Sequence, residues 1–242
     1  MSAAAFFDVD NTVIRGSTMY CMARGMISRG VFPPGQIANL VYRQARFVLT
    51  NAEQATDMTT IVTQAQRLVA GRQVSQVREF GERVFERSMV PRIWPEVAGL
   101  IAEHRQAGRE VWLVTSTGQE IADMLAEHLG ATGALGTRSE TADGRYTGRL
   151  AGPVMHGPAK AAAVRDLATA AGMELSDCYA YSDSANDIPL LSLVGHPVAV
   201  NSDSKLRTHA TEAGWDVLDC RHPSRVGRAM VTVRTVRHRV GL

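Results

Sequence analysis

The chain has 242 residues, of which 45% are hydrophobic, so it can bury the core of one domain and a smaller insertion. Its formal net charge of +2 is too slight to indicate nucleic acid, and we expect no nucleic-acid partner. No apolar run approaches the ~20 residues of a membrane span, and acidic residues interrupt the start too early for a signal peptide. We therefore predict a cytoplasmic protein without a membrane span.

The first predicted element is a buried strand, Ala4 to Val9, which delivers the carboxylates of Asp8 and Asp10 to its end. Residues two apart in a strand face the same way, so the two acids should enter one small space. Such a pair repels unless a cation or a proton intervenes, which favours a nucleophile with an acid/base partner. The alternative is an ordinary strand-to-loop turn, in which Asp and Asn side chains bond the backbone.

A helical block follows this strand, with no strand pattern inside it. The predicted helices are Met19–Ser28, Gly35–Leu49, Glu53–Ala70 and Val74–Ser88. An all-helical block between a first strand and its sheet partner is either a separate small bundle or an inserted cap.

After Pro91, helices and strands alternate, which predicts a parallel α/β sheet. The predicted helices here are 94–107, 120–129, 161–171 and 189–193, and the predicted strands are 111–115, 178–182 and 197–200. Between Leu135 and Leu150, the pair Asp143-Gly144 predicts a β-hairpin with a type I′ turn.

Polar residues that can bind phosphate or a metal follow these later strands. Thr115 and Ser116 bring hydroxyls and backbone amides to a strand end, where an anion can bind. The strand ending at Ser182 leads into a second acidic loop, with Asp183, Asn186 and Asp187. Ligand sets made only of oxygen favour a hard cation such as Mg²⁺.

Lysine is scarce, because the 26 basic residues include only Lys160 and Lys205 as lysines. Lys160 stands near the start of a predicted helix, where a compact point charge could serve a phosphate site. The alternative is a lysine on the helix surface. The three cysteines, Cys21, Cys178 and Cys220, have no metal-binding spacing, so we expect buried packing residues in a reducing compartment.

These pieces, in this order, resemble the haloacid dehalogenase (HAD) superfamily of phosphatases, and within it subfamily IB, the phosphoserine phosphatase-like branch. The resemblance spans nearly the whole chain. It implies an α/β fold with a Rossmann-like parallel sheet and a β-hairpin. The HAD-like core would comprise residues 1–14 and 91–242, and residues 15–90 would form a helical-bundle cap inserted after the first strand.

The resemblance implies a Mg²⁺-dependent phosphomonoesterase that hydrolyses a small phosphorylated metabolite through an aspartyl-phosphate on Asp8. Asp10 would be the general acid and base, and Lys160 would neutralise charge. The implied metal ligands are Asp8, the backbone carbonyl of Asp10, Asp183 and Asp187. The implied phosphate-binding residues are Thr115, Ser116, Lys160 and Asn186.

The substrate is where the chain departs from phosphoserine phosphatases. Those enzymes typically carry a glutamate at the position of Ser17, to meet the substrate ammonium, and a Gly-Gly pair at Ser116-Thr117. A buried ammonium without a carboxylate partner is costly, which favours another small phosphorylated metabolite. Phosphoserine stays open as the alternative. Candidate substrate contacts are Arg15, Ser17, Arg24, Arg43 and Arg46, and the arginine-rich tail, Arg221 to Arg239, is predicted to be solvated.

Two other classes of protein share parts of this pattern. A receiver domain also combines a phosphorylated aspartate, a hydroxyl residue and a lysine, but it needs about half this length and has no later acidic loop. A catalytically silent binding protein need not keep both Asp8 and Asp10. A phosphotransferase that passes the phosphoryl group to an alcohol remains open among the enzymes.

Overall fold

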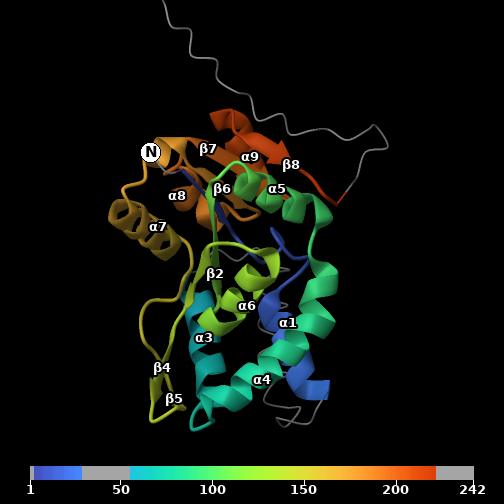
Figure 1. Ribbon diagram of the computed structural model, residues 1–242, viewed down its shortest axis with the longest axis vertical. Helices are drawn as coiled ribbons and strands as arrows, with labels where there is room; N and C mark the ends of the chain where they lie inside the picture. The colour runs from blue at the N-terminus through green and yellow to red at the C-terminus, as the bar shows by residue number, and fades with distance from the viewer. Residues whose placement is uncertain (1–2, 29–54, 222–242) are drawn as a thin grey trace, which may run out of the picture.

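The computed structural model describes residues 3–28 and 55–221 (Figure 1). The predicted helix Gly35–Leu49, the candidates Arg43 and Arg46, and the arginine-rich tail after Arg221 lie outside the described residues.

A six-stranded sheet in the order β3-β2-β1-β6-β7-β8 forms the centre of the described structure, and every neighbouring pair in it is parallel. Its strands are β1 (Ala4–Phe7), β2 (Glu110–Gly118), β3 (Gly133–Thr137), β6 (Tyr179–Ser182), β7 (His196–Val200) and β8 (Asp216–Leu218). The predicted parallel α/β fold is confirmed. Because β1 lies between β2 and β6, the segments that follow these three strands meet at one edge of the sheet.

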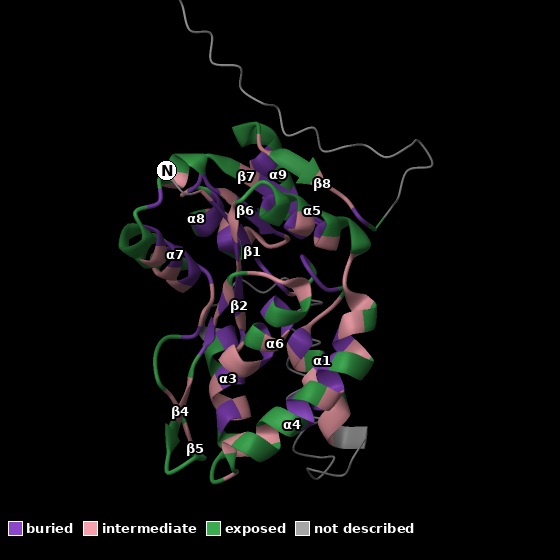
Figure 2. Cartoon of the chain, viewed as in Figure 1, coloured by how far each residue is buried: buried purple, intermediate pink, exposed green. Residues whose placement is uncertain are grey.

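Helices cover both faces of the sheet (Figure 1). The helices α5 (Pro95–Gln106) and α6 (Gln119–Leu129) share one buried cluster with Phe7. The helices α7 (Pro158–Ala171), α8 (Ile188–Leu191) and α9 (Ser204–Ala213) share the other with Phe6. The alternation along β1 thus assigns Phe6 and Phe7 to opposite faces of the sheet. The strands between the helices are largely buried (Figure 2).

The residues between β1 and α5 include α1 (Thr18–Ser28), α3 (Ala55–Val69) and α4 (Val74–Val84), and α4 continues through a π-helical turn, Phe85–Met89, and a 3₁₀ turn, Val90–Arg92. Side chains of α1 and α4 join the hydrophobic cluster of α5 and α6. At Gly81 a Cβ atom would come within 2.8 Å of Ile121 Cδ1, so the absence of a side chain lets α4 approach α6 closely.

The predicted hairpin is present as β4 (Ser139–Ala142) and β5 (Arg145–Leu150), which pair antiparallel. Asp143 and Gly144 both have positive φ, 50° and 71°, as a type I′ turn requires. The strand β5 packs along α3, where Gly148, with a φ of 83°, brings its Cα close to Ala70. The hairpin is shorter than predicted, because Leu135 belongs to β3 of the central sheet.

Several other boundaries differ from the sequence prediction. The first strand ends at Phe7, two residues early, because the chain turns back on itself when Val13 N–H and Ile14 N–H both donate to the Val9 carbonyl. The strands β3 and β8 and the helix α9 were not predicted. β3 contains two glycines and β8 spans three residues, so neither carries a strong strand pattern.

All three cysteines are buried and free, as expected for packing residues. In the described part of the chain, no helix combines the length and the apolar character that crossing a membrane requires.

Candidate active site

Asp8 lies directly after β1, at the edge where the carboxyl ends of β1, β2 and β6 meet. Its alternation with Phe6 directs it toward the α7 side of the sheet, and it is only 5% exposed. Its backbone N–H donates to the Tyr181 carbonyl at 2.9 Å, which continues the pairing of β1 with β6. The Thr12 hydroxyl donates to Asp8 Oδ2 at 3.2 Å.

Lys160 meets Asp8 from the first turn of α7. Its ammonium donates to Asp8 Oδ1 at 2.5 Å and to Asp187 Oδ2 at 2.7 Å, and the side chain is 4% exposed. Burial disfavours the ammonium, but the charges of Asp187 and Asp8 offset burial and raise the pKa of Lys160 above its usual value. Lys160 is therefore a charged group inside the protein, and not a lysine of the helix surface.

The acidic loop after β6 completes this cluster. Asp187 Oδ2 also accepts a hydrogen bond from the Ser182 hydroxyl at 2.8 Å, whereas Asp187 Oδ1 is buried without any hydrogen-bond partner. Burial, and then the charges of Asp8 and Asp187, raise the pKa of Asp183 well above its ordinary value. Burial also raises the pKa of Asp8 to about 6, against the opposing charge of Lys160.

These carboxylates suit a cation. Asp8, Asp183 and Asp187 carry three negative charges when ionised, and Lys160 supplies one positive charge. Burial, and then repulsion from neighbouring carboxylates, raise the pKa values of Asp8 and Asp183, and Oδ1 of Asp187 has no hydrogen-bond partner. A divalent cation would balance the remaining negative charge, and the donors are the oxygens that Mg²⁺ prefers.

The side chains of this site do not by themselves complete the coordination shell of a cation. Within residues 3–28 and 55–221, no three His, Cys, Asp or Glu side chains already converge as metal ligands. A cation here needs further oxygens, such as the backbone carbonyl of Asp10 and water, and Mg²⁺ commonly keeps several waters.

Asp10 lies near enough to Asp8 for its charge to add to the effect of burial on the pKa of Asp8, but the two carboxylates have different hydrogen-bond partners. Oδ1 of Asp10 accepts hydrogen bonds from the backbone N–H and the hydroxyl of Thr18, at 2.9 and 2.8 Å. The strand ends before these residues, so strand alternation does not govern Asp10. Burial raises the pKa of Asp10, although hydrogen bonds from Thr18 and Ser17 oppose this shift.

Ser17 has a local structural role. Its hydroxyl accepts from the Tyr20 N–H at 3.4 Å, as an N-cap residue does at the start of a helix. The neighbouring candidate Arg15 is exposed, with its guanidinium 4.8 Å from the ring centre of Trp94.

The phosphate-binding candidates differ in their burial and in their hydrogen-bond partners. Thr115 is buried within β2, which runs three residues beyond the predicted strand end, and its hydroxyl accepts from the Thr117 N–H at 3.2 Å. Ser116 is half-buried, and its carbonyl accepts from Thr137 at 2.8 Å. Asn186 is exposed, and its side-chain amide donates to Ser184 Oγ at 3.2 Å, a hydrogen bond within its own turn.

Sequence reasoning missed several supporting residues. Three buried hydroxyls donate to carboxylates of the site: Thr12 to Asp8, Thr18 to Asp10 and Ser182 to Asp187.

Asn201, just after β7, was also missed; its side-chain amide donates to the Asn11 carbonyl at 3.1 Å and braces the turn that follows Asp8. A polar residue at the end of the buried run Val198–Val200 was the available signal, the same one that identified Asp183.

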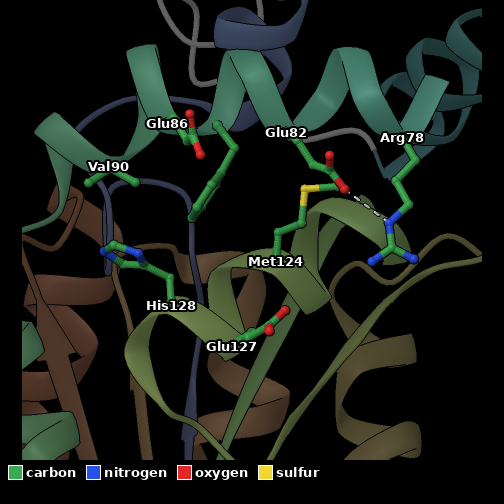
Figure 3. Close-up of a pocket in the computed structure, with 8 residues that line it drawn as sticks. Arg78, Glu82, Glu86, Val90, Met124, Glu127 and His128 are labelled. Carbon is green, nitrogen blue, oxygen red and sulfur yellow. Dashed lines mark hydrogen bonds and ion pairs between the residues drawn. The ribbon is translucent and has the colours of Figure 1, made fainter. Parts of the chain in front are cut away.

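A surface hollow of about 480 Å³ lies elsewhere, between α4 and α6 (Figure 3). Phe85, Met124 and His128 line it, together with Glu82, which accepts a hydrogen bond from Arg78. None of the predicted site residues lines this hollow, so it does not locate the chemistry.

A buried carboxylate–ammonium–carboxylate cluster at the carboxyl edge of a parallel sheet is typical of an enzyme active site in an α/β protein. The chain belongs to the haloacid dehalogenase-like hydrolase family, whose model matches residues 5–192. The predicted superfamily is confirmed, and subfamily IB stays a prediction.

Relatives with phosphatase names cover most of the chain. Phosphoserine phosphatase SerB1 of Mycobacterium tuberculosis is 42% identical over 228 residues, which are 94% of this chain and 74% of that protein. The histidinol-phosphatase of Neisseria meningitidis is 30% identical over 223 residues, 90% of this chain and 99% of that protein. The chain is accordingly a phosphatase, as predicted, and neither a receiver domain nor a silent binding protein.

Solved structures agree on the fold. A protein of unknown function from Bordetella pertussis superposes with a TM-score of 0.80 at 26% identity, covering 91% of this chain and 99% of that one. A phospho-aspartyl intermediate analogue of phosphoserine phosphatase superposes with a TM-score of 0.66 at 19% identity, covering 91% and 94%. The second likeness concerns the fold alone.

Proposed function

We propose that this phosphatase is a Mg²⁺-dependent phosphomonoesterase, which hydrolyses a small phosphorylated metabolite through an aspartyl-phosphate on Asp8. The observation that carries the proposal is the Lys160 ammonium, buried between Asp8 Oδ1 and Asp187 Oδ2. A carboxylate that attacks a phosphate dianion meets like-charge repulsion, so the nucleophile must be surrounded by positive charge. Asp8, which directly follows β1, contacts both Lys160 and a hydroxyl donor, Thr12.

In the first half of the reaction, Asp8 attacks phosphorus and the ester oxygen leaves. Thr115, in β2, supplies a hydroxyl and the backbone amides after it for the phosphoryl oxygens, and Lys160 offsets their charge. Asp10 gives a proton to the leaving oxygen, a role that the raising of its pKa by burial favours.

In the second half, Asp10 removes a proton from water, which hydrolyses the aspartyl-phosphate and regenerates Asp8. The metal ligands would be Asp8, the Asp10 carbonyl, Asp183 and Asp187. Mg²⁺, when bound, supplies positive charge that lowers the repulsion between the nucleophile and the phosphate. Many members of the family use this ion, and the oxygen donors of the site suit it.

We also propose that residues 15–90 act as a cap over residues 1–14 and 91–242. The chain leaves and re-enters the core along two adjacent segments, because Arg15 N–H donates to the Arg92 carbonyl and Trp94 N–H to the Val13 carbonyl, at 2.8 and 2.9 Å. A cap anchored this way could exclude water and select the leaving group of the substrate.

For the substrate, we favour a small phosphorylated metabolite other than phosphoserine. Ser17, which replaces the expected glutamate, caps α1 and offers no charge to a substrate ammonium. Phosphoserine is the second candidate, because the relative at 42% identity is named a phosphoserine phosphatase. Histidinol phosphate belongs in the same test, since a relative carries that name.

The test is phosphate release with Mg²⁺ across a panel of small phosphomonoesters that includes phosphoserine and histidinol phosphate, with Asp8→Asn protein run in parallel. We expect one ester to be turned over far faster than the rest, and only by the wild type. Adding candidate alcohols, and looking for a phosphorylated alcohol, separates hydrolysis from phosphotransfer. Turnover by the Asp8→Asn protein at the wild-type rate would refute the mechanism.

A further inference from the structure

Thr18, the first residue of α1, holds the carboxylate of Asp10 with two donors. Its backbone N–H and its hydroxyl both donate to Oδ1 of Asp10, at 2.9 and 2.8 Å. Thr18 is only 1% exposed, so water does not compete for these bonds. The first turn of α1 thereby orients a carboxylate that belongs to the loop after β1.

The Thr18 hydroxyl also makes a hydrogen bond with the hydroxyl of Thr117, in β2. A threonine hydroxyl has one proton to donate. If Thr18 donates its proton to Asp10, the Thr117 hydroxyl must be the donor to Thr18. The hydrogen bonds then run in one direction, from Thr117 through Thr18 to Asp10.

This arrangement decides which oxygen of Asp10 can carry a proton. Oδ1 accepts two hydrogen bonds, which occupy both of its lone-pair positions. A proton on Oδ1 would break one of them. The acidic proton of Asp10 therefore belongs on Oδ2.

Thr117 also touches the phosphate-binding side of the site. Its backbone N–H donates to the hydroxyl of Thr115 at 3.2 Å. A continuous set of contacts consequently joins the phosphate-binding threonine, Thr117, Thr18 and the carboxylate of Asp10.

We propose that Thr18 and Thr117 are positioning residues for Asp10, which hold its Oδ1 so that Oδ2 alone transfers the proton. This inference rests on the proposed function, because it takes Asp10 as the acid that protonates the leaving oxygen. Neither threonine touches the reacting atoms. Both act through Asp10.

The test is the kinetics of Thr18→Val, which keeps the shape and the backbone N–H but removes the hydroxyl. An alkyl phosphate needs a proton on its leaving oxygen, whereas para-nitrophenyl phosphate releases a stable phenolate without one. We expect kcat/KM for the best alkyl phosphate to fall by about 10- to 100-fold. The kcat/KM for para-nitrophenyl phosphate should change by less than about 3-fold, because this ratio reports only the steps up to release of the phenolate.

Further variants separate positioning from folding. Thr18→Ser restores a hydroxyl and should recover most of the lost kcat/KM. Thr117→Val should reduce the same ratio less than Thr18→Val, and the double variant should equal Thr18→Val alone, since both act through one hydrogen bond. Thr211→Val is the matched control, because this threonine is exposed and its hydroxyl donates to the Arg207 carbonyl of its own helix, α9.

Two outcomes would overturn the inference. Equal losses for the alkyl and the aryl ester would mean that Thr18 supports the site as a whole and not the acid. Wild-type kinetics in Thr18→Val would mean that the backbone N–H alone positions Asp10. In both cases Asp8→Asn would still be inactive; only activity in Asp8→Asn would instead refute the proposed function itself.

Discussion

The Lys160 ammonium lies 2.5 Å from Asp8 Oδ1, although the two residues are 152 positions apart in the chain. The same ammonium lies 2.7 Å from Asp187, so one buried cation joins the ends of β1 and β6 through the start of α7. Breaking a buried pair leaves an uncompensated charge in a medium of low polarity. This centre should therefore contribute both to catalysis and to stability.

Replacing the nucleophile should nearly abolish turnover. We expect Asp8→Asn to lower kcat by about 1,000-fold or more, because an amide cannot attack phosphorus and form the acyl phosphate. Asp10→Asn should also lower kcat strongly, but it should still form some aspartyl-phosphate with a good leaving group. Steady-state phosphate release measures both variants, and thermal unfolding checks that each is folded. A rate in Asp8→Asn within a few-fold of the wild type would contradict the assignment.

Removing the buried cation should cost stability as well as activity. We expect Lys160→Met to lower the free energy of unfolding by about 3 to 5 kcal/mol, because Asp8 and Asp187 lose their shared partner. Urea denaturation measures this change. Lys205→Met is the matched control, since Lys205 is the other lysine of the chain and is exposed on α9. Similar losses of free energy of unfolding in the two variants would contradict a role for Lys160 in balancing the charges of Asp8 and Asp187.

Mg²⁺ should stabilise the protein more at neutral than at acidic pH. The pKa of Asp8 is raised to about 6, above its ordinary value of 3.8, so its contribution to stability is present below about pH 4 and is lost as the pH rises through 6. At about pH 7.5 the ionised carboxylates of the site outnumber the single ammonium of Lys160, and Mg²⁺ supplies further positive charge. At about pH 5 protons compete with the metal.

Thermal unfolding with and without Mg²⁺, at both pH values, measures this difference. The increase in Tm should be larger at the higher pH, smaller in Asp8→Asn, and reversed by EDTA, which should also stop turnover. An equal increase at both pH values would contradict a role for Asp8 as a ligand.

His104 should make stability depend on pH through a different mechanism. It is buried, its Nε2 contacts the Tyr181 hydroxyl at 2.8 Å, and its Nδ1 accepts from Arg109 at 2.6 Å. Burial, and then the charge of Arg109, lower the pKa of His104 to about 4, from 6.5. The unfolded chain therefore binds a proton first as the pH falls, and the free energy of unfolding should decrease between pH 6.5 and 4.

Urea denaturation across this pH range, in wild type and His104→Gln, tests the assignment. The variant should lose this part of the pH dependence, whatever its stability at pH 7. His128→Gln, at an exposed histidine of α6, is the control and should keep the wild-type dependence. If the free energy of unfolding of His104→Gln changed with pH as steeply as that of the wild type, the pH dependence would belong to other groups.

The polar residues at strand ends were predictable because their strands have a local signature. Val111–Val114 and Tyr179–Ser182 are short buried runs followed at once by hydroxyl or acidic residues. Parallel strands of an α/β sheet bring their carboxyl ends to one edge, so the sequence alone assigns Thr115 and Asp183 to one site. Lys160 stood out by composition, since it is one of two lysines.

The separate partners of Asp8 and Asp10 were not predictable. The alternation of a strand applies only while the strand lasts, and here it stops at Phe7 because the chain turns at Val9. The positive φ of Asn11, 58°, belongs to this turn. Which acid then faces Lys160, and which faces α1, depends on a turn whose geometry no periodic pattern encodes.

The sequence by itself determined the family, the parallel α/β sheet, the inserted helices and the four segments that carry the polar site, because each depends on local pattern and order along the chain. Only the tertiary structure decided that Lys160 is buried between Asp8 and Asp187, and that Thr18 and Thr117 hold Asp10. Those contacts join residues 8 to 152 positions apart, and their distances follow from how β1, β2, β6, α1 and α7 pack together.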